Sequence, residues 1–221
     1  MKKRLERALL AAAVAVVTGI GASAMIWPAD AQERLADQRT AMRAEFAPNM
    51  VAGAPTSTPI GYARFCAEMP GECDDTPRRA GKVVLGEAQF AELRAVNDEI
   101  NRRITPMTDL EHYGEVERWT YPDDGIGDCE DYVLLKRRTL ISLGWPAEML
   151  LITVVRDHQG DGHSVLTVVT DRGDLVLDNQ SPVIVPWHDT GYRFVKRQAQ
   201  NNANEWLSLG DVLAPLTVGR Y

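Results

Sequence analysis

The stretch GIGDCEDYVLLKRRTLISLGW, residues 125–145, decides the fold of this chain. It starts as a glycine-containing loop and continues with apolar residues at helical spacing until a glycine and a proline end the pattern. Asp128 fits the N-cap, so Cys129 takes the first helical position. The unpaired N–H groups and aligned peptide dipoles of a helix start favour a thiolate, which makes Cys129 a candidate nucleophile. Its acidic neighbours Asp128, Glu130 and Asp131 oppose that effect and need their own explanation.

Helices are predicted before this stretch and strands after it. Apolar residues recur every three or four positions from residue 87 to 104, which predicts an amphipathic helix that Pro106 ends. Four later segments are rich in β-branched residues and are separated by glycine-containing turns; they cover residues 149–156, 163–170, 174–179 and 192–198. This order predicts an α+β fold, with N-terminal helices followed by an antiparallel meander.

Two of the predicted strands carry the partners that a cysteine nucleophile needs. His163 begins one strand, and Asp178 ends the next. In an antiparallel hairpin the start of the first strand lies near the end of the second, so these side chains are expected close together, although the register stays open. Cys129, His163 and Asp178 then supply a nucleophile, a base and a group that orients the base.

The N-terminus has the composition of a targeting segment. Residues 1–31 combine four basic residues with a long apolar run and an Ala-Asp-Ala sequence typical of a cleavage site. We expect a secretory signal peptide or, because the run nearly spans a bilayer, an uncleaved N-terminal anchor. Residues 32–60 are predicted to form a weakly structured segment, and 61–221 the folded domain. Either way the domain is expected outside the cytoplasm, secreted or periplasmic.

The net charge and the cysteine content indicate which partners and which disulfide to expect. The formal charge is −7, and residues 1–31 hold four bases and two acids, so the remainder carries −9. Nucleic acid is therefore excluded as an expected partner, whereas divalent cations suit such a chain. Cys66 and Cys73 flank a Pro-Gly turn, so we predict a disulfide between them and leave Cys129 as the free thiol.

Taken together, GDCEDYVLLKRRTLISLGW, DGHSVLTVV and LVLDN resemble the bacterial transglutaminase-like cysteine proteinases, a secreted family with a papain/transglutaminase-like fold. The FC…PGEC and VNDEIN segments add to the likeness, which covers roughly residues 60 to 200. The resemblance implies a peptidase in which Cys129 attacks a carbonyl, His163 transfers the proton and Asp178 orients the imidazole.

The same resemblance implies a cofactor and partners. Members that release biofilm adhesins depend on calcium, and the acids flanking their cysteine are ligands, which here are Asp128 and Glu130. A bound dication would cancel the charge that disfavours the thiolate. The remaining ligands stay open; Asp131, Asp123 and Asp124 are merely near. The resemblance also implies a secreted or surface protein as substrate, such as an adhesin, and an inner-membrane receptor for cyclic di-GMP that sequesters the protease.

Several alternatives remain open on the sequence alone. The acids around Cys129 could act only as an N-cap and a first turn that complements the helix dipole. Asn179 could replace Asp178 as the orienting group, and an oxyanion donor could come from the Cys129 N–H, Trp119 or Asn179. The same acyl-enzyme could be resolved by an amine, as in a transglutaminase. The chain could also be a catalytically idle module that binds peptides.

Overall fold

The computed structural model describes residues 48–73 and 76–213. The predicted signal or anchor at 1–31, and most of the segment at 32–60, lie outside these residues. Among the residues described, no helix combines the length and apolar character needed to cross a membrane.

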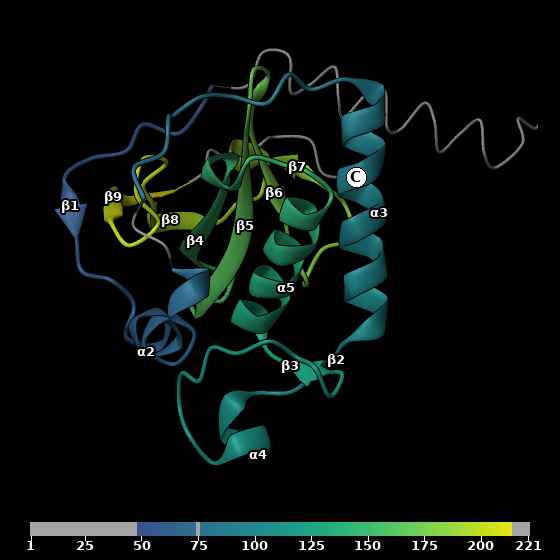
Figure 1. Ribbon diagram of the computed structural model, residues 1–221, viewed down its shortest axis with the longest axis vertical. Helices are drawn as coiled ribbons and strands as arrows, with labels where there is room; N and C mark the ends of the chain where they lie inside the picture. The colour runs from purple at the N-terminus through teal and green to yellow at the C-terminus, as the bar shows by residue number, and fades with distance from the viewer. Residues whose placement is uncertain (1–47, 74–75, 214–221) are drawn as a thin grey trace, which may run out of the picture.

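An antiparallel sheet of seven strands forms the centre of the fold (Figure 1). Its order is β1-β9-β8-β4-β5-β6-β7. The strands are β1 (Pro55–Thr56), β9 (Trp206–Leu213), β8 (Arg193–Gln198), β4 (Leu150–Arg156), β5 (Gly162–Thr170), β6 (Gly173–Leu177) and β7 (Val185–Pro186). The central strands β4, β5 and β6 are buried almost throughout, since helices and loops cover them on both faces.

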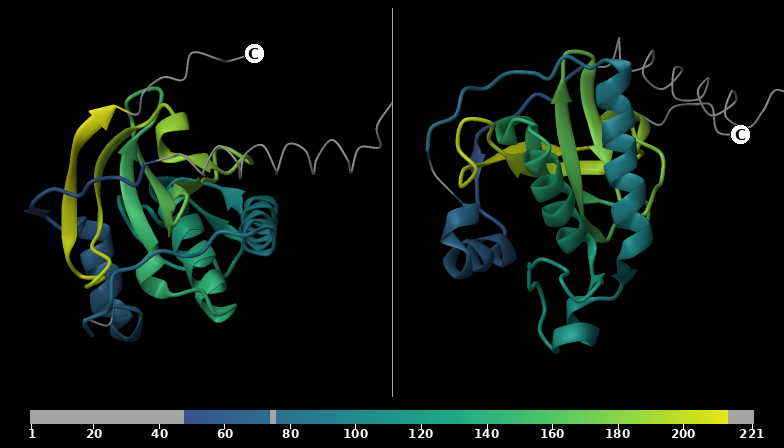
Figure 2. Two further views of the ribbon diagram at one scale, coloured as in Figure 1. Left: turned by 90° about the horizontal axis from the view of Figure 1, so that it is seen from above. Right: turned by 45° about the vertical axis from the view of Figure 1, so that its right-hand side comes forward.

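Two long helices cover one side of the sheet. Helix α5 (Cys129–Ser142) packs against β5, and α3 (Glu87–Arg103) runs beside α5 (Figures 1 and 2). A parallel bridge of β2 (Thr105–Pro106) with β3 (Ile126–Gly127) joins the end of α3 to the start of α5, so the two helices are antiparallel. Shorter helices complete the fold: α2 (Ile60–Glu68), α4 (Asp109–Tyr113), and the 3₁₀ turns η1 (Pro70–Glu72), η2 (Ala147–Met149) and η3 (Trp187–Asp189).

The predicted α+β class is confirmed, and so are the two long helices and four predicted strands. The predicted meander holds only for β4, β5 and β6, because β8 returns to pair with β4 on the other side. Strand β9, which extends the sheet beyond β8, had not been predicted. Sequence periodicity identifies a strand, but strand order depends on contacts between distant segments.

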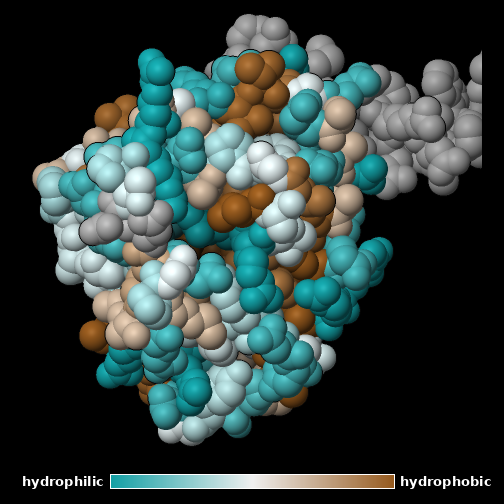
Figure 3. Space-filling view, viewed as in Figure 1, coloured by the Kyte–Doolittle hydropathy of each residue, from teal (hydrophilic) through white to brown (hydrophobic). Residues whose placement is uncertain are grey.

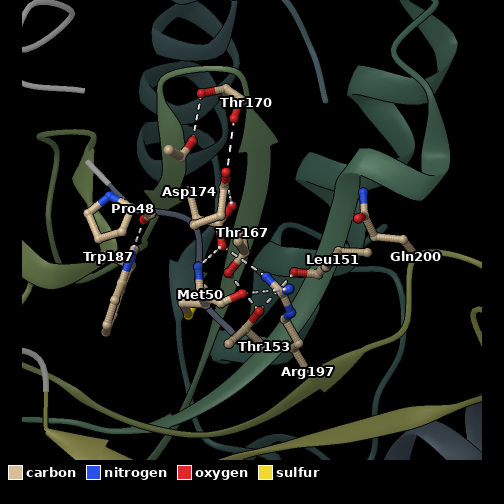
Figure 4. A network of polar contacts seen from close by, with 12 residues as sticks. Pro48, Met50, Leu151, Thr153, Thr167, Thr170, Asp174, Trp187, Arg197 and Gln200 are labelled. Carbon is tan, nitrogen blue, oxygen red and sulfur yellow. Dashed lines mark hydrogen bonds and ion pairs between the residues drawn. The ribbon is translucent and has the colours of Figure 1, made fainter. Parts of the chain in front are cut away.

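A buried ion pair fastens the N-terminal part of the described chain to the sheet (Figure 4). Arg197 on β8 contacts Asp174 on β6 at 2.9 Å, and the same carboxylate accepts a 2.8 Å hydrogen bond from the Met50 N–H. Arg197 also donates to the Met50 carbonyl, and Trp187 donates to that of Pro48. The described part of the segment predicted to be weakly structured is thus bound to the sheet at residue 50 and to Trp187 at residue 48.

The predicted disulfide between Cys66 and Cys73 is present, and it links α2 to the end of η1. Asn204, which precedes β9, donates to the Cys73 carbonyl at 2.9 Å and so ties this corner to the sheet. The disulfide and this hydrogen bond thus hold the corner beside α2 in place.

Outside the core, hydrophilic residues cover most of the face seen in Figure 1, with hydrophobic residues showing mainly between them (Figure 3).

Candidate active site

Cys129 is the first residue of α5 and is half-buried. Asp128 has the extended backbone of an N-cap, but its side chain makes no capping hydrogen bond. The predicted helix start and the N-cap position of Asp128 are therefore confirmed, although the cap is made by the backbone conformation and not by a side-chain hydrogen bond. Its carboxylate lies close to the ligand atoms of Cys129 and Glu130 instead, all within 4.8 Å of one another.

His163 and Asp178 meet as the hairpin argument predicted. Leu166 of β5 pairs with Leu177 of β6, so the start of β5 lies beside the residues that follow β6. His163 Nε2 is 2.8 Å from Asp178 Oδ1, and both side chains are buried. Asp178, rather than Asn179, is thus the residue that contacts the imidazole.

Further donors hold the Asp178 carboxylate in place. The Tyr192 hydroxyl donates to Oδ2 at 2.7 Å, and the Gln180 N–H donates to Oδ1 at 2.9 Å. Burial raises the pKa of Asp178, but these bonds and His163 outweigh it and hold the pKa below its usual value. Asp178 is accordingly a carboxylate at neutral pH.

The backbone of β5 connects this pair to the cysteine. The N–H of Ser164, the residue after His163, hydrogen-bonds to the Cys129 sulfur. A pocket of about 220 Å³ opens beside them, lined by His163, Ser164, Trp119 and Glu130 among others. The structure thus places the His163–Asp178 pair beside the start of α5, where Cys129 lies.

The expected low thiol pKa is not produced by the protein groups alone. Burial raises the pKa of Cys129 well above its usual value, and the charge and hydrogen bond of Glu130 and the charge of Asp128 raise it further. The Ser164 N–H acts in the opposite direction. The helix start was expected to favour the thiolate, but burial and the acids outweigh it.

In this arrangement the thiol and the imidazole each have another partner. The Cys129 thiol donates to Glu130 Oε2 at 2.7 Å. His163 Nδ1, the ring nitrogen that does not face Asp178, lies 3.4 Å from the Gln180 side-chain amide. Transfer of the thiol proton to His163 therefore requires Glu130 and Gln180 to give way.

A second group of acids lies beside the first and shares Asp128 with it. Carboxylate oxygens of Asp109, Asp128 and Asp131 lie within 4.8 Å of one another. One oxygen each of Asp128 and Asp131 is buried and has no hydrogen-bond partner among the described residues. Burial raises the pKa of Asp131 and Glu130 to about 8, and that of Asp109 to about 6, with the charge of Asp128 adding to each. These carboxylates repel one another in a site that a cation would stabilise.

The other predicted acids are engaged elsewhere. Asp123 pairs with Arg138 at 3.5 Å, and Asp124 pairs with His112 at 2.9 Å. Asp109 was not predicted from the sequence; it is the first residue of α4 and lies next to Asp128 and Asp131. Asp131 was predicted only as a neighbour of the site. Tyr192 and Gln180 were not predicted either, because the local sequence carries no signal for them.

Comparison with known proteins identifies the family. A model of the bacterial transglutaminase-like cysteine proteinases matches residues 52–213. Similar solved structures include Legionella pneumophila LapG, 29% identical over 55% of this chain and 70% of that chain, with a TM-score of 0.47. A calcium-bound LapG from the same organism is 21% identical over 83% and 93%, also with a TM-score of 0.47. No curated protein matches the chain significantly. Since the family model covers most of the described residues, the chain belongs to the bacterial transglutaminase-like cysteine proteinases and is a cysteine peptidase.

Proposed function

We propose that this chain is a secreted or periplasmic endopeptidase in which Cys129 is the nucleophile, His163 the general base and Asp178 the group that orients the imidazole. The observation that carries the proposal is the buried contact of His163 Nε2 with Asp178 Oδ1 at 2.8 Å. Ser164, the next residue after His163, donates its N–H to the Cys129 sulfur. Nucleophile, base and orienting acid are the three parts that acyl transfer by a thiol needs.

The hydrogen bonds assign the ring nitrogens of His163. Because Asp178 is ionised and only accepts, His163 donates from Nε2, which leaves Nδ1 with a lone pair for the thiol proton. Cys129 then attacks a peptide carbonyl as a thiolate, and the imidazolium returns its proton to the leaving amine. Asp178 and Tyr192 keep the ring oriented through both transfers.

We further propose that Asp128 and Glu130 bind calcium, with Asp109 and Asp131 as additional ligands. The donor set fits, since carboxylate oxygens are what calcium prefers and two of them are buried without a partner. A bound calcium ion would supply positive charge that offsets the acids beside the thiol. Glu130, once engaged as a ligand, would no longer accept the hydrogen bond of Cys129, and the thiol could turn to His163.

The proposed substrate is a secreted or surface protein, such as an adhesin, and an inner-membrane receptor for cyclic di-GMP is the proposed regulator. Support comes from the resemblance of the GDCED and DGHSV segments to adhesin-releasing members of the family. The Cys66–Cys73 disulfide supports an oxidising compartment, as does the composition of residues 1–31.

The test uses the purified chain and candidate surface proteins, with calcium or with chelator. We expect cleavage with calcium, a loss of at least a hundredfold with chelator, and no cleavage by Cys129→Ala. Cleavage by the alanine variant would overturn the assignment of the nucleophile. A labelled primary amine that enters the product would instead favour the transglutaminase reaction.

Calorimetry tests the calcium ligands separately. Asp128→Ala and Glu130→Ala should lose the binding isotherm of the wild type. Asp123→Ala is the matched control, because this acid lies five residues before the motif but pairs with Arg138. An unchanged isotherm in the first two variants would rule out the proposed ligands.

A further inference from the structure

Lys136 is a buried cation for which the peptidase mechanism has given no role. It lies on α5 seven residues after Cys129, and its side chain has no exposed surface. Within the described residues its Nζ has no hydrogen-bond partner; the Tyr132 ring centroid is 5.8 Å away. A buried ammonium with so little compensation costs free energy, and an apolar side chain of the same length would fill this space more favourably.

The packing of α5 on α3 shows what Lys136 lies close to. The helices are antiparallel, and the Tyr132 hydroxyl donates to the Ile104 carbonyl at 2.6 Å, which fixes their register. One turn further along α5 comes Lys136, and about one turn back along α3 comes Asn101. Asn101 donates to the backbone carbonyl of Asp178 at 2.8 Å. Lys136 is thus level with the contact that holds Asp178 to α3.

The charges that act on Lys136 agree with this location. Burial lowers the pKa of Lys136 to about 7, and the charges of Asp178 and then Asp98 act against that shift. Asp178 itself faces His163 of β5, Tyr192 and the Gln180 N–H, none of which carries a fixed positive charge. Lys136 is therefore the buried basic side chain on α5 whose positive charge, when present, can offset that of the Asp178 carboxylate.

We propose that Lys136 is a positioning residue, whose buried ammonium compensates the charge of Asp178 from the helix that carries Cys129. It touches neither substrate nor sulfur, and acts through Asp178. The proposal rests on the catalytic roles proposed above. Its consequence is that Asp178 keeps its charge to lower pH than its other contacts alone would allow, because a nearby positive charge disfavours protonation of an acid.

Lys136→Met removes the charge and keeps the length of the side chain. In saturating calcium we expect the acid limb of the kcat/KM profile to move to higher pH by about one unit, a tenfold lower activity on that limb. The matched control is Arg137→Met, which also removes a buried cation of α5. Arg137 donates to the Leu150 carbonyl on the other side of the helix, so its loss should lower stability without moving the limb. An identical acid limb in Lys136→Met and wild type would overturn the proposal.

A second measurement does not depend on how well Lys136→Met folds. In the Cys129→Ala background, NMR of the Lys136 Nζ follows its titration with and without Asp178→Asn. We expect the pKa of Lys136 to fall when Asp178 loses its charge, and an unchanged titration would refute the coupling. If Cys129→Ala still cleaved substrate, the proposed function would fail; if only the Lys136 measurements were negative, this inference alone would fail.

Discussion

Tyr192→Phe gives the sharpest test of how the site is held together. The substitution removes one hydroxyl, which donates to Asp178 Oδ2 at 2.7 Å, and keeps the ring that packs edge-on against His163 at 5.7 Å. Both Tyr192 and Asp178 are 4% exposed, so water cannot replace the lost bond freely. A hydrogen bond to a charged group contributes about 1.5–3 kcal/mol. We expect the free energy of unfolding to fall by that amount at pH 7.

Loss of this hydrogen bond should also raise the pKa of Asp178. About 1.5–3 kcal/mol corresponds to about one to two pKa units, so the pKa of Asp178 should be higher by that amount in Tyr192→Phe. The pKa of Asp178 is depressed in the folded wild type. The stabilisation that this carboxylate contributes is therefore present above its unfolded pKa and is lost as the pH falls through its folded pKa. The difference between wild type and variant should therefore be full at pH 7 and shrink below about pH 4.

Urea unfolding between pH 3 and 7 measures both effects. Tyr121→Phe is the control, because its hydroxyl donates at 2.8 Å to Glu72, an acid that is more exposed than Asp178 and has no role in the proposed triad. It should cost about 0.5–1.5 kcal/mol and leave peptidase activity unchanged. A Tyr192→Phe cost below that of the control, or one that stays constant down to pH 3, would refute the reasoning.

Three further outcomes follow from buried groups. Asp131→Asn should abolish the rise in melting temperature that calcium produces in differential scanning calorimetry, since it removes a carboxylate oxygen that is buried without a partner. Replacing Cys66 and Cys73 by serine should cost about 2.5 kcal/mol in urea unfolding, as expected for the short loop they close. Arg197→Met leaves the buried carboxylate of Asp174 without its cation and should cost about 3–5 kcal/mol, with faster hydrogen exchange near residue 50; unchanged exchange there would contradict the role of the pair.

Much of the fold could be predicted because its signals are local. The helix at 129–142 shows apolar residues at helical spacing, and the central strands are short runs of β-branched residues bounded by turns. Strand β9 alternates less clearly and was missed, and the pairing of β8 with β4 could not be read because no local feature encodes a partner. The attachment of residues 48–57 was hidden for the same reason, since its contacts join residues more than 120 positions apart.

In the candidate site, too, the residues with local sequence signals could be predicted, and those placed by tertiary packing could not. Cys129, His163 and Asp178 could be named from the sequence because a helix start and the two ends of a hairpin are local features, and chain order then brings them together. Asp109 and Tyr192 come from elements that give no hint of the site. Only the packed structure decided the pKa of the thiol, because burial and the orientation of Glu130 depend on the whole surroundings of the sulfur. The sequence determined which groups this chain has for chemistry, and the tertiary structure decided their charge and their partners, since both depend on desolvation and distance.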